Sequence, residues 1–239
     1  MKLTIILGLI SLIVIPREGL SEKLNLSEVA EKYLQERFPD NLESWSLTGG
    51  YRLSNENPVA GTVHPFQYQG DCNNRSSSQS PKCKDLHIWI LNKSIVTPFV
   101  MLANVTASYK GEKTETFQFN LSDATTVTWN PENVTEPINY TAAIVEQKCN
   151  FSAQVDLTGW LAYKLRHARG DQPLNNAVGI GHIEKPKGGL VKNGHEGLSY
   201  TVRGTYIHRV ICLPEGDLKT PGNKKDEKKT RKTSGKRQT

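Results

Sequence analysis

Residues 149–165 (CNFSAQVDLTGWLAYKL) and residues 198–212 (LSYTVRGTYIHRVIC) alternate apolar and polar side chains along most of their length. A period of two is typical of half-buried β-strands, because successive side chains point to opposite faces of a sheet. When Cys149 is placed opposite Cys212 in an antiparallel pair, the two apolar faces match and Phe151 meets Val210. A slip of one residue would turn one apolar face outward. We therefore predict a long two-stranded ribbon closed by a Cys149–Cys212 disulfide. The alternative is that the two strands belong to different sheets.

The start of the chain has the composition of a targeting segment. It combines a charged Lys2, an apolar run over residues 3–15 and small residues shortly before position 22. These features predict a secretory signal peptide over residues 1–21. No later run reaches the ~20 apolar residues that a spanning helix needs. We expect the mature protein to be secreted, extracellular and soluble.

Secretion changes the interpretation of the four cysteines, because disulfides persist in oxidising compartments. Four cysteines allow three pairings, and none of the four is expected to be a catalytic thiol. Proximity favours Cys72–Cys83 around the polar loop 73–82, and the ribbon register favours Cys149–Cys212. In the chain-entropy model these two bonds would contribute about 3 and about 4 kcal/mol.

Asn-X-Ser/Thr motifs for N-linked sugar recur along the chain and indicate an extracellular glycoprotein. The eight motifs begin at Asn25, Asn74, Asn92, Asn104, Asn120, Asn133, Asn139 and Asn150. Several alternate with apolar residues, as Asn104 does between Ala103 and Val105. We expect these asparagines on the solvent face of their strands, where sugar can be attached.

The formal net charge of +6 is concentrated in the C-terminal tail. Residues 219–239 hold nine basic and two acidic residues, which is a net charge of +7. We predict that residues 216–239 form a disordered tail and that the chain binds no nucleic acid. Trypsin-like proteases could cut the tail at its paired basic residues, which are Lys224, Lys225, Lys228, Lys229, Arg231, Lys232, Lys236 and Arg237. The tail could anchor the protein to anionic lipid or glycan, be a removable pro-segment, or only aid solubility.

The rest of the chain predicts an all-β fold that is elongated, with the long antiparallel ribbon, a sandwich and one short N-terminal helix. The helix is expected over residues 26–38, capped by Ser27 and ended by Pro39. Short strands are expected over residues 51–53, 63–68, 86–91, 95–109, 116–121, 125–129, 138–145 and 178–183. The expected domains are residues 22–85, with the helix and short strands, and residues 86–215, which are β-rich.

Motifs for catalysis are absent from the sequence. There is no nucleophile elbow, phosphate loop or dinucleotide fingerprint, and the six histidines lack the spacing of a zinc site. We therefore predict no enzymatic activity, no cofactor and no metal, although His182 and His195 lie in polar, glycine-rich surroundings. Arg169-Gly170-Asp171 matches a three-residue adhesive motif that could meet an integrin. The alternative is an ordinary solvated turn.

The order of several segments carries a resemblance to a known family. Asn104-Val105-Thr106 is followed by threonine-rich alternating strands, then by Pro137 and residues 139–142. Residues 151–160 follow, and a late strand holds residues 202–206. In this order, over about residues 86–213, the chain resembles the aerolysin-type β-pore-forming proteins, in particular epsilon-toxin-like relatives from insects and other arthropods.

The resemblance implies a secreted protein that binds a cell-surface receptor or lipid membrane and assembles into a ring of identical copies. Each copy would add an amphipathic hairpin to a closed β-barrel, because backbone polar groups in lipid must be paired. Clipping of a terminal segment, as the basic tail allows, often activates such proteins. The expected hairpin, within residues 106–129, is short for strands that need ~9–11 residues, and a sugar on Asn120 would block its passage.

The function predicted from the sequence is therefore a venom or defence toxin that binds cell surfaces and forms a membrane pore. The alternative is a non-lytic extracellular binding or egg-storage glycoprotein on the same fold.

Overall fold

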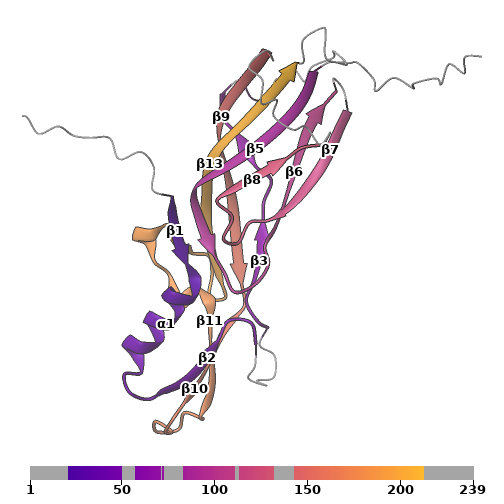
Figure 1. Ribbon diagram of the computed structural model, residues 1–239. Coiled ribbons are helices and arrows are strands. Elements are labelled where there is room, and N and C mark those ends of the chain that lie inside the picture. Colours follow the sequence, from indigo (N-terminus) through magenta and orange to yellow (C-terminus); the bar gives the residue numbers. More distant parts are fainter. Residues whose placement is uncertain are drawn as a thin grey trace, which may run out of the picture.

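The computed structural model describes residues 21–49, 57–70, 72, 83–110, 113–131 and 143–212, which form an elongated molecule (Figure 1). Several predicted features lie outside these residues: the signal peptide, the strand over residues 51–53, the motifs at Asn74, Asn133 and Asn139, and the basic tail with its cleavage sites.

The described elements are strands, one α-helix and two short 3-10 helices, so the predicted all-β class with one N-terminal helix is confirmed. In chain order they are β1 (Glu22–Asn25), α1 (Leu26–Arg37), β2 (Leu42–Ser46), β3 (Ala60–Val63), β4 (Gln67–Tyr68), β5 (Cys83–Val96), β6 (Leu102–Tyr109), β7 (Lys113–Asn120), β8 (Thr126–Trp129), β9 (Ala143–Thr158), β10 (Trp160–Leu165), β11 (Asn175–Gly179), η2 (Ile180–Ile183), η3 (Pro186–Gly188), β12 (Leu190–Lys192) and β13 (Gly197–Cys212).

The largest sheet has the order β1-β5-β13-β9-β3, with β12, β4 and β8 pairing at its sides. Its centre is the predicted ribbon, β9 against β13, which pairs antiparallel along the full 16 residues of each strand. The predicted register is wrong, because Tyr206 rather than Cys212 lies opposite Cys149. The difference between positions 212 and 206 is even, so every side chain keeps its predicted face. An alternating pattern specifies the face of a strand but does not separate registers that differ by an even number.

The first ribbon strand ends earlier than predicted. Gly159 has a φ of +128°, and a Cβ at this position would lie 2.6 Å from the carbonyl oxygen of Pro58. Beyond this glycine, β10 leaves β13 and pairs with β2 and β11 in a three-stranded sheet. This small sheet and α1 form the lower end of the molecule in Figure 1.

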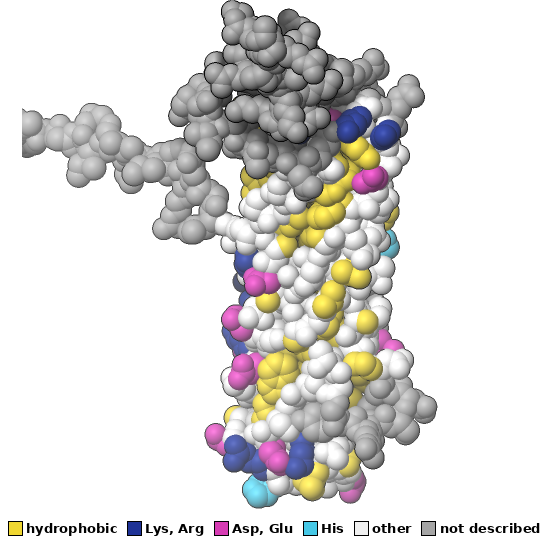
Figure 2. Space-filling model, turned by 45° about the vertical axis from the view of Figure 1, so that its right-hand side comes forward, with side chains coloured by type: hydrophobic (Ala, Val, Ile, Leu, Met, Phe, Trp, Pro, Cys, Tyr) yellow, Lys and Arg dark blue, Asp and Glu magenta, His cyan; other side chains and the backbone are white. Residues whose placement is uncertain are grey.

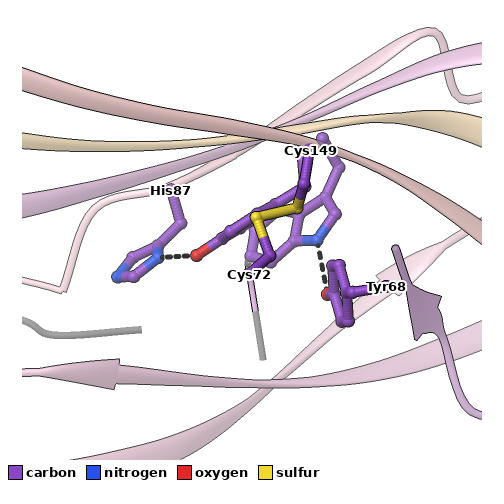
Figure 3. The surroundings of a disulfide bond; sticks show 6 residues. Tyr68, Cys72, His87 and Cys149 are labelled. Atoms are coloured by element: carbon purple, nitrogen blue, oxygen red, sulfur yellow. Dashed lines mark hydrogen bonds between the residues drawn. A yellow bond between two sulfur atoms is a disulfide. The ribbon is translucent and has the colours of Figure 1, made fainter. Parts of the chain in front are cut away.

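The four cysteines form two disulfides, but both predicted pairings are wrong. The bonds are Cys72–Cys149 and Cys83–Cys212, with sequence separations of 77 and 129 residues. The reason is that β5 lies on the free side of β13 and brings Cys83 opposite Cys212. Figure 3 shows the Cys72–Cys149 bond beside Tyr68 and His87. Taken alone, each disulfide would stabilise the folded protein by about 4–5 kcal/mol in the chain-entropy model, because each closes a long loop.

The helix begins at Leu26 as predicted and ends at Arg37, but its cap is not the predicted Ser27. Asn25 is the N-cap, and its side-chain oxygen accepts hydrogen bonds from the backbone N–H groups of Ser27 and Glu28. The buried face of the helix repeats every four residues, through Leu26, Ala30 and Leu34. Because Leu26 must join this face, the asparagine before it takes the capping position.

The remaining strand limits differ from the prediction in several places. The strand expected over residues 63–68 is the end of β3 followed, after a gap, by β4. β5 is a single strand of 14 residues that begins at Cys83, and the break that Pro98 causes falls between β5 and β6. The strand expected over residues 178–183 is instead the end of β11 followed by η2. Three strands that lie within residues 22–85 join the large sheet: β1 pairs with β5, and both β3 and β4 pair with β9. The fourth, β2, pairs with β10 in the small sheet.

Candidate functional site

The β6–β7 hairpin forms a sheet of its own within the described part of the chain. Its two strands pair with each other from Leu102 opposite Asn120 to Tyr109 opposite Lys113. One face of this hairpin is largely apolar and buries Ala103, Val105, Ala107 and Phe119, but it also carries the exposed Lys113 and Glu115 where the two strands end. In Figure 1 the hairpin lies against one side of the large sheet. Side-chain packing, rather than a shared backbone ladder, therefore holds most of its length.

The other face of the hairpin carries no charge and, apart from the exposed Leu102, is polar. Gln118 donates a hydrogen bond of 2.9 Å to Asn104, and the hydroxyls of Thr106 and Thr116 lie 3.4 Å apart. Figure 2 looks toward this side of the molecule and shows few charged side chains in its middle, whereas charges gather toward the ends and one flank.

Aromatic rings hold the apolar face of the hairpin to the sheet beneath it. The ring of Phe117 lies 6.0 Å from Trp89 of β5 and 5.9 Å from Trp129 of β8, measured between centroids. Phe119 meets Phe66 edge to face at 6.1 Å. Such aromatic pairs add about 0.5–1.5 kcal/mol each beyond the area that they bury.

The base of the hairpin continues the same alternation. Met101 and Leu121 are both buried, and the N–H of Leu121 donates to the carbonyl oxygen of Met101 at 2.7 Å. The side-chain oxygen of Asn120 accepts hydrogen bonds from the backbone of Met101 and Ser122. The two-faced pattern therefore extends over residues 101–109 and 113–121, which is nine residues in each arm.

The tip of the hairpin contacts a buried carboxylate. Where β6 ends, the backbone N–H of Lys110 donates to Oδ2 of Asp85 at 3.0 Å. The other oxygen of Asp85 lies 2.8 Å from Nε2 of His208. Asp85 is fully buried, and His208 is 2% exposed.

A second histidine completes this group. The ring of His87 stacks on that of His208, with the centroids 4.7 Å apart and the planes 2° from parallel. Nδ1 of His87 lies 2.8 Å from the hydroxyl of Tyr206. Burial acts to raise the pKa of Asp85, but the hydrogen bonds from His208 and Lys110 outweigh it and hold that pKa below its ordinary value. We call Asp85, His87, Tyr206 and His208 the acid–histidine cluster.

The sequence reasoning missed this cluster. Asp85 and His87 alternate in phase at the start of β5, as Tyr206 and His208 do near the end of β13. This alternation would have suggested polar residues on a buried face, but nothing local shows that the two pairs meet.

The structure describes five of the motif asparagines and confirms the exposed side expected for Asn104, Asn120 and Asn150. Asn92, Asn104, Asn120 and Asn150 are exposed, whereas Asn25 is half-buried as the helix cap. Attachment of sugar at these positions stays a prediction.

Arg169-Gly170-Asp171 lies between β10 and β11. All three residues are exposed, Gly170 has a φ of +61°, and the N–H of Gln172 donates to the carbonyl oxygen of Arg169 at 3.2 Å. The motif therefore sits on a tight turn that projects from a hairpin end.

His182 and His195 come together although they are 13 positions apart in the sequence. Their ring centroids are 4.6 Å apart, and Trp160 lies 5.6 Å from His195. Partial burial, then the proximity of His195 and Lys192, lowers the pKa of His182. Among the residues that the structure describes, no group of three or more His, Cys, Asp or Glu side chains could hold a metal ion.

Ser199, Asp156 and His64 also lie together, but in an order that does not fit nucleophilic catalysis. The hydroxyl of Ser199 donates to one oxygen of Asp156 at 2.6 Å, and Nε2 of His64 lies 2.7 Å from the other. An activated serine needs the imidazole next to its hydroxyl. Here the carboxylate lies between them, so this trio does not activate the serine.

Within the described ranges, no helix is long and apolar enough to cross a bilayer. No protein-family model matches the chain, and no curated protein matches it.

Solved structures do match. One is the Cry23Aa1 and Cry37Aa1 binary protein complex, with a TM-score of 0.43, 10% identity and coverage of 80% of this chain and 86% of that chain. A non-toxic crystal protein from Bacillus thuringiensis has a TM-score of 0.45 and 9% identity, covering 80% of this chain and 94% of that chain. The Mpp75Aa1.1 beta-pore-forming protein from Brevibacillus laterosporus has a TM-score of 0.31 and 10% identity, covering 79% of this chain and 86% of that chain.

A β-pore-forming protein is thus among the solved structures to which this chain is similar. Because all three TM-scores lie below 0.5, the proposals that follow rest on this chain's own residues.

Proposed function

We propose that this protein is a secreted, glycosylated toxin that binds cell surfaces, assembles with other copies and inserts residues 101–121 into the membrane as part of a pore. The observation that carries the proposal is the two-faced hairpin. One face is largely apolar, the other is uncharged and mostly polar, and the hairpin shares no backbone ladder with the large sheet among the described residues.

The lengths and faces of the hairpin suit a bilayer. A tilted membrane strand needs ~9–11 residues, and each arm of the extended hairpin supplies nine. The residues in phase with Val105 would face lipid, and those in phase with Thr106 would face a water-filled lumen. Lys113 and Glu115 are in phase with Val105 but lie where the strands end, near the bilayer interface, where a charge costs least. A single hairpin leaves both edges unpaired in lipid, so several copies must join in a closed ring.

Insertion would exchange one apolar environment for another. In the soluble form the apolar face packs on Trp89 and Trp129, and in the membrane it would pack on lipid chains. Each fully buried apolar side chain is stabilised by about 1.5–3 kcal/mol relative to water, and this stabilisation would be kept after transfer. The hairpin would keep its apolar burial, whereas the side chains of the large sheet that it covers, such as Trp89, would need new contacts in the assembled ring.

The first experiment measures release of a trapped dye from phosphatidylcholine liposomes, with and without anionic lipid and with and without proteolytic removal of the tail. We expect dye release together with ring-shaped oligomers in electron micrographs. Absence of both under all conditions would contradict the proposal.

A second experiment tests which face meets lipid. All four cysteines are in disulfides, so a single added cysteine can be labelled selectively. A lipid-dissolved quencher should reach a fluorophore on Ala107→Cys in the membrane-bound state, because Ala107 belongs to the apolar face. The matched label on Thr116→Cys should respond only to a water-soluble quencher. Equal quenching at both sites would show that the hairpin does not insert.

A second candidate function is a non-lytic extracellular binding or storage glycoprotein. The observation that favours it is the position of Asn104 and Asn120, which are both exposed on the polar face of the hairpin. Sugar at either site would crowd a lumen and hinder passage through the bilayer. Thr106→Val removes the motif at Asn104 without changing the asparagine. If sugar blocks insertion, this variant should release more dye than the glycosylated parent.

We further propose that Arg169-Gly170-Asp171 contributes to cell-surface attachment through an adhesive receptor. Its support is the exposed, tightly turned conformation of the motif. Asp171→Glu keeps the charge but lengthens the side chain, so it should abolish adhesion of receptor-bearing cells to the immobilised protein. Unchanged adhesion would assign the motif to an ordinary turn.

A further inference from the structure

We propose that the groove between α1 and residues 183–185 binds the phosphocholine headgroup of membrane lipids. Such binding rests on the proposed function, because it would supply one contact of the attachment to cell surfaces. The residues that line the groove belong to neither the hairpin nor the acid–histidine cluster.

The groove has a partly apolar lining that the fold leaves uncovered. Leu24 of β1 and Ile183 of η2 line it and are themselves buried. Val29 and Tyr33 line it from α1 and are only half-buried. These two residues are four positions apart, so they are neighbours on one side of the helix. The volume is about 390 Å³, which is within the range of pockets that hold small molecules.

Charges of both signs surround this apolar lining. The groove is lined by three lysines and three glutamates, which are Lys23, Lys32, Lys185, Glu28, Glu36 and Glu184. The three positive and three negative formal charges cancel, so the groove as a whole favours neither a simple anion nor a simple cation. A ligand with one charge of each sign can place each end near groups of the opposite sign.

The charges of residues 183–185 are the ones that a ligand can use. Two of the other lysines already lie near carboxylates, at 2.9 and 3.7 Å. In the part of the chain that the structure describes, the side chains of Glu184 and Lys185 form no ion pair and no hydrogen bond. One wall of the groove therefore offers a carboxylate and an ammonium group side by side.

Phosphocholine has the matching chemistry. Its ammonium group is fully methylated and donates no hydrogen bond, so it binds to the face of an aromatic ring and to nearby carboxylates. Tyr33 supplies a half-buried ring in the groove, and Glu184 supplies the carboxylate. The phosphate at the other end of the headgroup needs a cation, which Lys185 supplies.

The wall opposite the helix is held in place by the backbone. The backbone groups of Lys185 and Leu190 exchange two hydrogen bonds, at 2.9 and 3.2 Å, and Leu190 is buried. Gly189 has a φ of +82°, which permits the tight turn between them. The groove is thus formed before a ligand enters, so little ordering of the chain opposes binding.

The experiment measures binding of the full chain to vesicles by flotation, with phosphatidylcholine vesicles and with phosphatidylglycerol vesicles. Asn25 also lines the groove and begins a glycosylation motif, so N-linked sugars are trimmed enzymatically first. We expect binding to phosphatidylcholine vesicles that free phosphocholine abolishes and that equal concentrations of choline or inorganic phosphate weaken less. Phosphocholine should not compete for the phosphatidylglycerol vesicles.

Two substitutions test the groove directly. Lys185→Glu reverses the charge of one wall, and Tyr33→Ala removes the ring, so each should weaken binding to phosphatidylcholine vesicles by about tenfold or more. Tyr33→Phe keeps the ring and should bind like the parent. Lys187→Glu is the matched control, because it makes the same charge change at an exposed position outside the groove.

Equal binding by the parent and Lys185→Glu, or binding that phosphocholine does not reduce, would overturn the proposal. If Tyr33→Ala does not fold, Lys185→Glu still decides the question, since Lys185 is exposed. Competition by a short peptide of lysine and glutamate, without competition by phosphocholine, would assign the groove to a protein partner and overturn the lipid ligand.

Dye release separates the groove from the pore. Binding that phosphocholine abolishes and Lys185→Glu loses, without dye release from any vesicle, would leave the groove standing and overturn the proposed pore. Dye release that is equal in the parent and in Lys185→Glu, and that phosphocholine does not reduce, would overturn the groove and leave the pore standing.

Discussion

The three central strands and the hairpin beside them are held by different kinds of interaction. We call β5, β9 and β13 the frame. Its strands share continuous backbone ladders, two disulfides tie its upper part, and Trp89, Tyr200 and Tyr206 are fully buried in it. The hairpin has strands of eight residues and, among the described residues, no disulfide and no ladder to the frame. From this difference we predict that the hairpin can separate while the frame stays folded, as a local unit of low stability.

The largest expected effect is on the frame itself. Replacing both Cys83 and Cys212 with serine removes the bond that joins β5 to β13, and should lower the free energy of unfolding by about 2–5 kcal/mol. Urea denaturation of parent and variant measures the loss. A change below about 1 kcal/mol would show that the ladders alone hold the frame.

A side chain added at a closely packed position of the frame should lower the free energy of unfolding by less than loss of the disulfide does. A Cβ on Gly204 would lie close to the carbonyl oxygen of Ile90 and within 2.5 Å of the ring of Phe151. Gly204→Ala should therefore destabilise the protein by about 1–3 kcal/mol in the same assay. Thr201→Ala, an exposed position on the same strand, should change the stability by less than about 0.5 kcal/mol. Equal values for the two variants would contradict the close packing at Gly204.

A substitution in the hairpin should destabilise the hairpin without destabilising the frame. Val105 is 2% exposed, and Val105→Ala should weaken the packing of the hairpin by about 1–2 kcal/mol. We expect faster hydrogen exchange in residues 102–120 with almost no change in the urea midpoint. If both measurements shift together, the hairpin and frame unfold as one unit and the comparison between them fails.

The smallest expected effect concerns a surface carboxylate of the frame. Partial burial acts to raise the pKa of Asp156. The hydrogen bonds from Ser199, Gln154 and His64 lower it by more than burial raises it, so the pKa lies below its ordinary value. A lowered pKa in the folded state stabilises the protein above the ordinary value, near pH 4, and this contribution is lost as the pH falls through the folded pKa. Asp156→Asn should remove less than about 1 kcal/mol near neutral pH and flatten the stability curve below about pH 4. Thermal melts between about pH 2 and pH 6 measure this, and a curve as steep as that of the parent would exclude the contribution.

The faces of the strands could be predicted because alternation is a local property. Phe151 lies on the buried side and Asn104 on the exposed side, as their neighbours in the sequence indicate. The helix was predictable for the same reason, since Pro39, which marks its end, is a local signal. These features depend only on residues close together in the chain.

The candidate site was predictable only in part. The sequence indicates amphipathic strands between residues 102 and 120. The expected hairpin lay within residues 106–129, whereas the structure pairs β6 with β7. The acid–histidine cluster was not foreseen, because Asp85 and His208 are 123 positions apart and meet only where β5 lies beside β13.

By itself, the sequence determined which side of the alternating strands faces solvent. It also determined that two disulfides form and that the class is all-β with one helix. Only the tertiary structure decided the register of β9 on β13, the partners of the cysteines and the carboxylate under the hairpin tip. The physical reason is that a period of two repeats identically after every second residue. Alignments that differ by an even number bury the same faces, so the choice among them depends on contacts between distant strands.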